Sequence, residues 1–243
     1  MLIILDGWGY RPENEGNAIS LAHTPFLDSL QTQYPQTHLL CAGEAVGLPP
    51  GTIGNSEVGH LNIGAGRVVC QNLLRINSAI QDGSFLKNEI LNSILSKIKA
   101  NHSALHLMGL VSDGGVHSHV DHLFALLDTA IGYGLRNIYI HAILDGRDAP
   151  PDSGVRYMQK LQNYIHHCGT GTIASICGRY FAMDRDGRWD RTEKSYRLFT
   201  RAEGKVEADP VQAIKNAYRR NESDEFVKPI TIQKNRSQRL PTV

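Results

Sequence analysis

The chain has 243 residues, of which 41% are hydrophobic and 20% charged, and its 25 Lys and Arg residues nearly balance 24 Asp and Glu residues. This composition is typical of a folded globular protein and excludes collagen, coiled coils and disordered chains. A formal net charge of +1 gives no electrostatic reason to expect a nucleic-acid or membrane-surface partner. No run approaches the roughly 18 apolar residues of a membrane span, and we expect no signal peptide. Four scattered cysteines without a CxxC pair favour a reduced, cytoplasmic chain.

Short apolar runs alternate with amphipathic stretches along the chain. In chain order we expect a strand at 2–5, a helix at 24–33, a loop at 47–54, a helix from about 56, a helix at 85–100, a strand at 105–111, a helix at 120–133, a strand at 137–144, a helix at 153–168, a strand at 172–177 and a helix at 210–219. This alternation predicts an α/β fold with parallel-rich sheets flanked by helices. The polar stretch 67–84 is a candidate domain crossing, and 229–243, which has no period, is interpreted as a tail.

An aspartate and a serine occupy the positions expected of a nucleophilic site. Asp6 directly follows the first apolar run and is placed to hold a hard cation, although it is equally suited to a turn. Ser56 starts a helix after a glycine-rich loop, where free N–H groups favour a phosphate. A serine hydroxyl needs a base or a metal to become a nucleophile, and Asp6 could supply that metal. The alternative is that Ser56 is only a helix cap.

A histidine cluster follows the predicted strand 105–111. His117, His119, Asp121 and His122 have the spacing H-x-H-x-D-H, which is typical of a binuclear zinc site in a metallo-hydrolase. A second interpretation makes His117 a phosphate contact or proton donor and places the other two histidines on the first helical turn. A third makes all three histidines partly solvated residues at the start of a helix.

Arginines follow the ends of the later predicted strands. Arg147 and Asp148 follow strand 137–144, and Arg179 and Arg185 follow strand 172–177. Arginine suits two-pronged binding of carboxylate or phosphate, so this set predicts a small, doubly anionic substrate. The alternative is a set of surface ion pairs, each contributing about 0–1 kcal/mol. We prefer that alternative for Arg188 and Arg191.

The motifs LDGWG, GTIGNSEVGHLNIGAGR, SDGGVHSH, LDGRD and GRYFAMDRDGRWDR together resemble cofactor-independent phosphoglycerate mutase, of the alkaline-phosphatase superfamily. The resemblance covers roughly residues 1–228. It implies that 1–70 is the N-terminal part of a metal-binding phosphatase-like domain and that 71–228 is an inserted phosphotransferase domain of α/β fold. Residues 229–243 would then be a tail outside the family pattern.

The resemblance also implies the chemistry. Two Mn²⁺ ions, with Mg²⁺ as an alternative, would be bound in part by Asp6 and Ser56, and Ser56 would be the nucleophile that becomes phosphoserine. The implied substrate-binding set is His117, Arg147, Asp148, Arg179 and Arg185. The implied reaction interconverts 3-phosphoglycerate and 2-phosphoglycerate. We expect a monomer with no nucleic-acid or membrane partner.

Some expected residues have no counterpart. Family members are longer, and the resemblance implies further Asp and His metal ligands, two arginines and a lysine that are absent from these 243 residues. We therefore expect an N-terminal piece with both domains incomplete and with weak or no turnover by itself. The alternatives are a metal-dependent phosphatase or metallo-hydrolase that uses the H-x-H-x-D-H segment, and a non-catalytic fragment.

Overall fold

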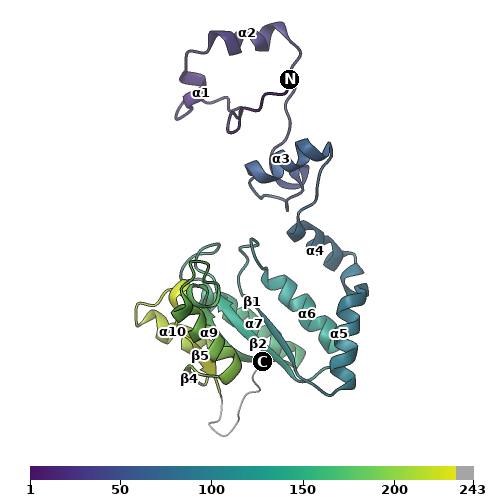
Figure 1. Cartoon of the computed structure of the whole chain (residues 1–243), viewed down its shortest axis with the longest axis vertical. Coiled ribbons are helices and arrows are strands. Elements are labelled where there is room, and N and C mark those ends of the chain that lie inside the picture. Colours follow the sequence, from purple (N-terminus) through teal and green to yellow (C-terminus); the bar gives the residue numbers. More distant parts are fainter. Residues whose placement is uncertain (234–243) are drawn as a thin grey trace. The chain divides into compact units, whose positions relative to one another are not determined.

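The chain divides into two compact units. The computed structural model describes residues 1–233, and the division falls after Arg75, inside helix α4 (Asn72–Gln81) (Figure 1). Unit 1 is defined here as residues 1–75 and unit 2 as the residues from 76 onward. None of the helices in residues 1–233 has both the length and the hydropathy of a membrane span.

Unit 1 consists of short helices joined by long loops. Its elements are α1 (Ala18–Leu21), α2 (Pro25–Gln33), the 3₁₀ helix η1 (Gly43–Val46) and α3 (Ser56–Ala65). The side-chain oxygen of Asn55 caps α3 by accepting a hydrogen bond from the backbone N–H of Val58 at 3.1 Å. The predicted helices 24–33 and from about 56 are confirmed.

The strand predicted at residues 2–5 is wrong. These residues form no regular element, and all four side chains are exposed. A strand requires a neighbouring strand to satisfy its backbone groups, and residues 1–75, all of them described, contain no strand.

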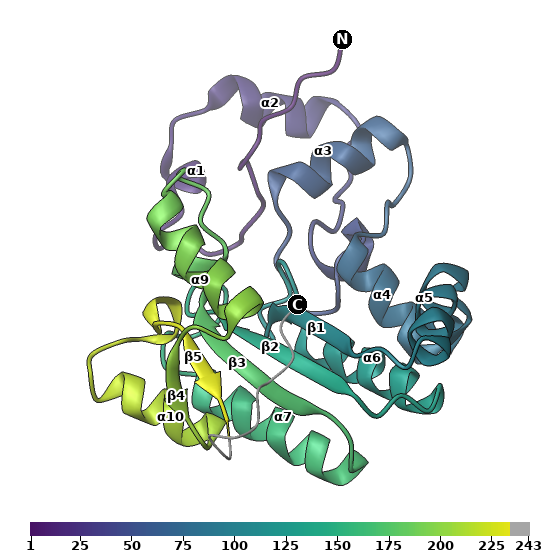
Figure 2. The same ribbon diagram turned by 60° about the horizontal axis from the view of Figure 1, so that its bottom comes forward.

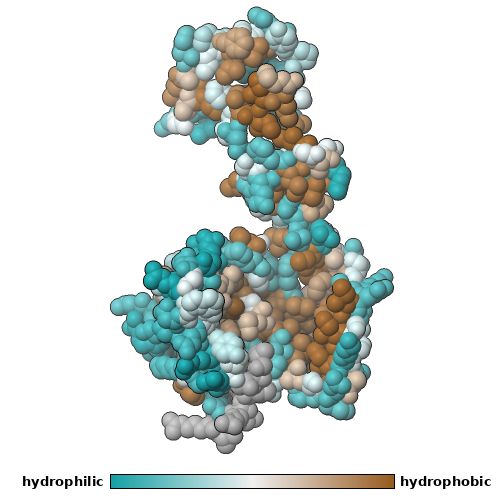
Figure 3. Space-filling model, in the orientation of Figure 1, coloured by the Kyte–Doolittle hydropathy of each residue, from teal (hydrophilic) through white to brown (hydrophobic). Residues whose placement is uncertain are grey.

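Unit 1 lacks a hydrophobic core of its own. Val46 and Val58 are its only buried large apolar side chains. Exposed large side chains include Leu2, Ile3, Trp8, Phe26, Leu39, Leu40 and Ile53. Figure 3 shows hydrophobic residues gathered on the visible face of this unit. Because burial of apolar surface is the main force that stabilises a domain, residues 1–75 contribute little folding free energy by themselves.

Unit 2 contains a five-stranded, mostly parallel sheet. Its strands are β1 (Leu105–Leu110), β2 (Ile138–Leu144), β3 (Thr172–Gly178), β4 (Lys205–Glu207) and β5 (Ile230–Ile232). The order is β1-β2-β3-β5-β4, and only the pairing of β3 with β5 is antiparallel. The α/β fold class predicted from the sequence is confirmed.

Helices cover both faces of this sheet (Figure 2). They are α5 (Glu89–Ala100), α6 (Val120–Gly132), α7 (Gly154–Cys168), α8 (Arg179–Ala182), α9 (Trp189–Arg201) and α10 (Pro210–Tyr218), with the 3₁₀ helices η2 (Ser84–Lys87) and η3 (Asp224–Phe226). Side chains of α5, α6, α7 and α10 share the main core with the strands, and a smaller core joins Cys177 to α8 and α9. Because β1, β2 and β3 are parallel, the segments that follow them leave the sheet at the same end of the strands.

The helix predicted at 85–100 is interrupted. Asn88 separates η2 from α5 and caps α5 by accepting a hydrogen bond from the backbone N–H of Leu91. Leu91, Leu95 and Ile98 pack into the main core. Leu86, Ile90 and Ile94, which helical spacing over 85–100 would place on the same face, are exposed.

The interpretation of 229–243 as a tail is wrong for its first residues. Ile230, Thr231 and Ile232 form β5, are buried, and lie between β3 and β4 in the sheet. A three-residue strand is too short to show a periodic pattern, so the strand could not be predicted from hydrophobic periodicity. The rest of that segment, 234–243, lies outside the described residues.

Replacing Gly178 by alanine is expected to destabilise unit 2 by at least about 2 kcal/mol. A Cβ at Gly178 would lie 2.2 Å from the carbonyl oxygen of Glu225 and 2.7 Å from that of Asp224, and backbone atoms cannot move aside cheaply. Gly132→Ala at the end of α6 is the matched control, because a Cβ there meets nothing within 4 Å. Urea unfolding followed by circular dichroism measures both. Equal stabilities of the two variants would contradict this packing.

Candidate active site

A polar cavity of about 500 Å³ lies where the strands of unit 2 end. Its walls come from the loops after β1 and β2, from α8 and the loop that follows it, from α9 and from η3, in line with the rule that ligands bind beyond the strand ends of open α/β sheets. The lining residues are His117, Arg147, Asp148, Arg179, Tyr180, Met183, Asp184, Arg185, Asp186, Arg191, Glu225 and Phe226. The structure thus brings together all five residues predicted as the substrate-binding set.

Arg179 is the most tightly held cation of the cavity. Its Nη1 donates to Oδ1 of Asp145 at 2.6 Å and to Oδ2 of Asp148 at 2.7 Å. Burial by itself would lower the pKa of Arg179, but the hydrogen bonds to these two carboxylates raise it. Arg179 therefore stays charged, with one nitrogen fully engaged by protein groups.

Arg191 is not the surface ion pair that we expected. Its Nη1 lies 3.1 Å from Oδ1 of Asp184, a carboxylate whose side chain is only 2% exposed. The guanidinium also stacks over the ring of Tyr180, 3.9 Å from its centroid. Arg191 and Asp184 are cavity residues that the sequence analysis missed, because an arginine inside a helix gives no signal of the partner it reaches.

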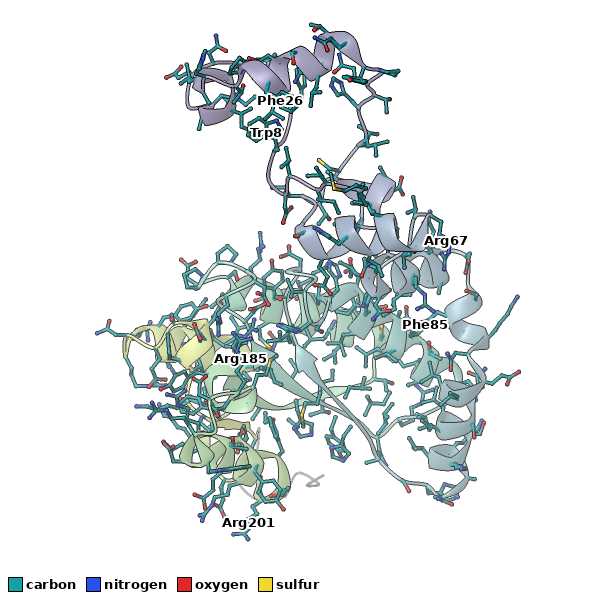
Figure 4. The ribbon with its side chains drawn as sticks, turned by 45° about the horizontal axis from the view of Figure 1, so that its top comes forward. Trp8, Phe26, Arg67, Phe85, Arg185 and Arg201 are labelled. Atoms are coloured by element: carbon teal, nitrogen blue, oxygen red, sulfur yellow. The ribbon has the colours of Figure 1, made fainter. Side chains whose placement is uncertain are left out.

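Arg185 lies on the loop between α8 and α9 (Figure 4). Within residues 1–233 no carboxylate lies within 4 Å of its guanidinium, whereas each other cavity arginine has an acidic partner. Arg147 is intermediate, because its Nη1 is 3.9 Å from Oε1 of Glu225 and its side chain is half exposed. Arg185 thus carries the positive charge that is most available to an anionic ligand.

The three histidines of H-x-H-x-D-H do not form one site, although the rings of His119 and His122 have centroids 5.6 Å apart. Nε2 of His117 lies 3.8 Å from Oδ2 of Asp148 at the cavity. His119 caps α6 by accepting a hydrogen bond from the backbone N–H of Asp121, and Nε2 of His122 lies 2.7 Å from Oδ1 of Asn77. The described residues contain no group of three or more His, Cys, Asp or Glu placed to bind a metal ion. The geometry therefore gives no support to the metallo-hydrolase alternative.

Asp6 and Ser56 lie together in unit 1, although the sequence separates them widely. Ser56 Oγ donates to Oδ2 of Asp6 at 2.7 Å. Nδ1 of His60 lies 2.8 Å from the Ser56 carbonyl oxygen and 3.2 Å from its Oγ. Ser56 is the first residue of α3, where backbone N–H groups are free of helical partners. The structure thus brings Asp6 and Ser56 together, and they are called the acid–serine pair below; their roles stay predictions.

The acid–serine pair fits a divalent cation in part. A carboxylate and a hydroxyl oxygen are ligands that hard cations prefer, and Mn²⁺ or Mg²⁺ takes about six. Residues 1–233 place these two oxygens together with Nδ1 of His60, 3.2 Å from Ser56 Oγ, and contain no group of three or more His, Cys, Asp or Glu that could hold a metal ion. The described residues therefore supply a partial ligand set.

Asp224 links η3 to the start of α7. Its side chain is buried and accepts hydrogen bonds from the backbone N–H of Gly154 at 2.7 Å and from the hydroxyl of Tyr218. Burial raises the pKa of Asp224 to about 6, although these hydrogen bonds act to lower it. The neighbouring residues Glu225 and Phe226 are thereby held at the cavity.

Asp224→Asn is expected to change how stability depends on pH. Because the folded-state pKa of Asp224 lies above its ordinary value, its stabilising contribution is full below pH 3.8 and is lost as the pH rises through about 6. The rise from 3.8 to about 6 corresponds to about 3 kcal/mol. The free energy of unfolding of the variant minus that of the wild type should therefore increase by up to about 3 kcal/mol between pH 3.8 and about pH 6. Urea unfolding at a series of pH values measures this difference. A difference that does not vary with pH would contradict the assignment.

The fold and the cavity together indicate the class of protein. Unit 2 is an α/β domain with an arginine-rich cavity at its strand ends, and unit 1 carries a serine hydroxyl bonded to a carboxylate. Residues 76–242 match the family model described as BPG-independent PGAM N-terminus, and the chain belongs to this family. The match includes most of 229–243, so the expectation that this segment lies outside the family is wrong.

Curated relatives have high identity to the chain. The 2,3-bisphosphoglycerate-independent phosphoglycerate mutase of Moorella thermoacetica is 55% identical over 232 residues, which are 96% of this chain and 45% of the relative. The protein of the same name from Methanococcoides burtonii is 55% identical over 233 residues, with the same coverage. A crystal structure of Leishmania mexicana phosphoglycerate mutase at low cobalt concentration matches with a TM-score of 0.75 and 32% identity, over 99% of this chain and 46% of that one. The chain spans about half the length of the curated relatives it matches.

Proposed function

We propose that this chain supplies the nucleophile and the substrate-binding cavity of a cofactor-independent phosphoglycerate mutase that interconverts 3-phosphoglycerate and 2-phosphoglycerate. The observation that carries the proposal is the convergence of His117, Arg147, Asp148, Arg179 and Arg185 on one cavity. The names of the relatives support the same activity. Unit 1 would be part of the metal-binding phosphatase-like domain, and unit 2 the phosphotransferase domain.

Ser56 is the proposed nucleophile. Its Oγ attacks phosphorus, a bond from Oγ to phosphorus forms, and the phosphorus–oxygen bond to the substrate breaks. The hydroxyl proton passes to Oδ2 of Asp6, with which Ser56 already shares a hydrogen bond of 2.7 Å, and from there to the glycerate oxygen that leaves phosphorus. Free N–H groups of the first turn of α3 favour the charge of the resulting phosphoserine. In the return step the other hydroxyl of the glycerate attacks phosphorus, the bond between phosphorus and Ser56 Oγ breaks, and the proton of that hydroxyl passes to Oγ.

A divalent cation is the proposed cofactor, with Asp6 and Ser56 as two of its ligands. Mn²⁺ is the ion that we propose, in a site for two ions, and Mg²⁺ is the alternative. Support for a metal comes from the oxygen donors of the acid–serine pair and from the cobalt named for the Leishmania relative. When bound, such a cation would lower the pKa of the Ser56 hydroxyl. Because residues 1–233 supply only part of a ligand set, we expect little turnover from this chain alone.

The cavity arginines are proposed to bind the substrate's phosphate and carboxylate. Arg185 would bind the ligand with a charge that no carboxylate of residues 1–233 shares. Arg147 would leave its 3.9 Å contact with Glu225 to bind the ligand, and Arg179 would donate hydrogen bonds from a fixed position. Retaining the glycerate between the two transfer steps favours phosphoryl return over loss to water. We further propose a cytoplasmic monomer without a nucleic-acid or membrane partner.

Calorimetric titration of the 243-residue chain with 3-phosphoglycerate tests the cavity assignment. The expected result is saturable binding that weakens when the added ligand is glycerate without phosphate. A preparation with a native near-UV spectrum that gives no heat with 3-phosphoglycerate would contradict the proposed function.

A further inference from the structure

Asp145 lies behind the cavity rather than in its wall. It follows β2, its side chain is 3% exposed, and it is absent from the cavity lining. Its Oδ1 accepts hydrogen bonds from Nη1 of Arg179 at 2.6 Å and from the backbone N–H groups of Asp148 and Arg147 at 3.0 and 3.2 Å. Its Oδ2 accepts from Oγ of Ser112 at 2.6 Å.

These contacts join the ends of three neighbouring strands. Ser112 follows β1, Asp145 follows β2 and Arg179 follows β3. The two backbone contacts are those of an ordinary aspartate turn, but such a turn requires neither the serine nor the arginine. Burial acts to raise the pKa of Asp145, but hydrogen bonds, that from Ser112 foremost, hold the pKa below its ordinary value. The carboxylate therefore remains charged opposite the guanidinium of Arg179.

Two carboxylates fix the guanidinium of Arg179. Nη1 is bound by both Asp145 and Asp148, and the planar group cannot rotate about its bonds without breaking these contacts. The same two carboxylates neutralise the charge of Arg179. What Arg179 offers the cavity is thus a set of N–H donors held in one orientation, in contrast to the free charge of Arg185.

We propose that Asp145 is a positioning residue that orients Arg179 for the anionic ligand. The inference rests on the proposed function, since it presumes that the cavity binds a phosphorylated acid. Asp145 does not itself contact the ligand, and its whole effect on binding passes through Arg179.

Asp145→Asn isolates that effect. The amide Oδ1 still accepts from both backbone N–H groups and from Arg179, and Nδ2 donates to Ser112 Oγ, whose hydroxyl turns round. The variant keeps the shape and the turn and loses only the charge opposite Arg179. Asp152→Asn is the matched control, because it makes the same substitution at an exposed aspartate of the same loop, whereas the partners of Arg179 are Asp145 and Asp148.

The measurements are made on the full chain. The Nη–H signal of Arg179, assigned by its loss in Arg179→Lys, should exchange with solvent at least about tenfold faster in Asp145→Asn and stay unchanged in Asp152→Asn, because Nη1 makes the contact with Asp145. The affinity for 3-phosphoglycerate should fall about tenfold in Asp145→Asn, in line with the loss of one charge-assisted contact. In the Arg179→Lys background, the same substitution should cost less than about twofold.

The outcomes separate the two proposals. An unchanged Arg179 signal in Asp145→Asn, or losses of affinity that add in the double variant, would overturn the positioning role. If the wild-type chain fails to bind 3-phosphoglycerate while Asp145→Asn still releases the Arg179 signal, the proposed function fails and the positioning role stands. If Asp145→Asn lacks the native near-UV spectrum, Asp145→Glu replaces it, because a carboxylate displaced by one methylene should release Arg179 in the same way.

Discussion

Replacing Ser56 by alanine is expected to reduce mutase turnover by at least about 10³-fold. The expectation applies to the chain mixed with the remaining half of a relative, such as the Moorella thermoacetica protein, and with Mn²⁺. Alanine leaves the start of α3 in place, because Asn55 caps that helix. The substitution removes the Ser56 hydroxyl, which donates a hydrogen bond to Asp6. Conversion of 3-phosphoglycerate to 2-phosphoglycerate in a coupled assay gives the rate.

Ser29→Ala is the control for this variant. Ser29 lies in α2 of the same unit, and its hydroxyl donates only to the carbonyl oxygen of Phe26. Its turnover should stay within about twofold of the wild type, because the substitution removes one local hydrogen bond at a half-buried position away from the acid–serine pair. Comparable losses in the two variants would show that the effect of Ser56 is structural, and full activity of Ser56→Ala would remove it from the chemistry.

Arg185→Ala is expected to weaken binding of 3-phosphoglycerate by about 10- to 100-fold. No carboxylate within the described residues shares the charge of Arg185, so its full interaction with an anion is lost. No internal ion pair breaks, and the free energy of unfolding should change by less than about 0.5 kcal/mol. Calorimetry measures the affinity, and urea unfolding the stability.

Arg188→Ala tests whether position matters or only charge. Arg188 is exposed on the same loop and does not line the cavity. Its removal should change the affinity by less than about twofold, since exposed charges are well screened. Equal losses for Arg185 and Arg188 would mean that the ligand responds to the net charge of the loop, and would contradict specific binding in the cavity.

Long amphipathic segments account for the part of the fold that the sequence predicts. Helices α6, α7 and α10 show clear periodicity because one side of each is buried in the core, and strands β2 and β3 are recognisable as short apolar runs because nearly all of their residues are buried. The strands β4 and β5 are three residues long and show no periodicity. The strand predicted at 2–5 failed for a different reason, since apolar side chains alone do not supply the neighbouring strand that backbone pairing requires.

The cavity was more predictable than the contacts inside it. Arg147, Asp148 and Arg179 follow strands, and the parallel sheet brings strand ends together whatever the details of packing. Glu225 reaches the cavity only because buried Asp224 fastens η3 to the start of α7, a contact between residues far apart in the chain. The sequence left three interpretations of the histidine cluster open, because the H-x-H-x-D-H spacing does not show that the ring of His119 caps α6.

The central claim is that the hydroxyl of Ser56 accepts the phosphoryl group of a sugar-acid phosphate. The most direct measurement is mass spectrometry of the peptide that contains Ser56, after the chain has been mixed with the remaining half of a relative, Mn²⁺ and 3-phosphoglycerate and quenched in acid. The account predicts phosphate on Ser56 in the wild type and none on that peptide in Ser56→Ala. A folded, active mixture with no phosphate on Ser56, or with phosphate on another residue, would contradict it.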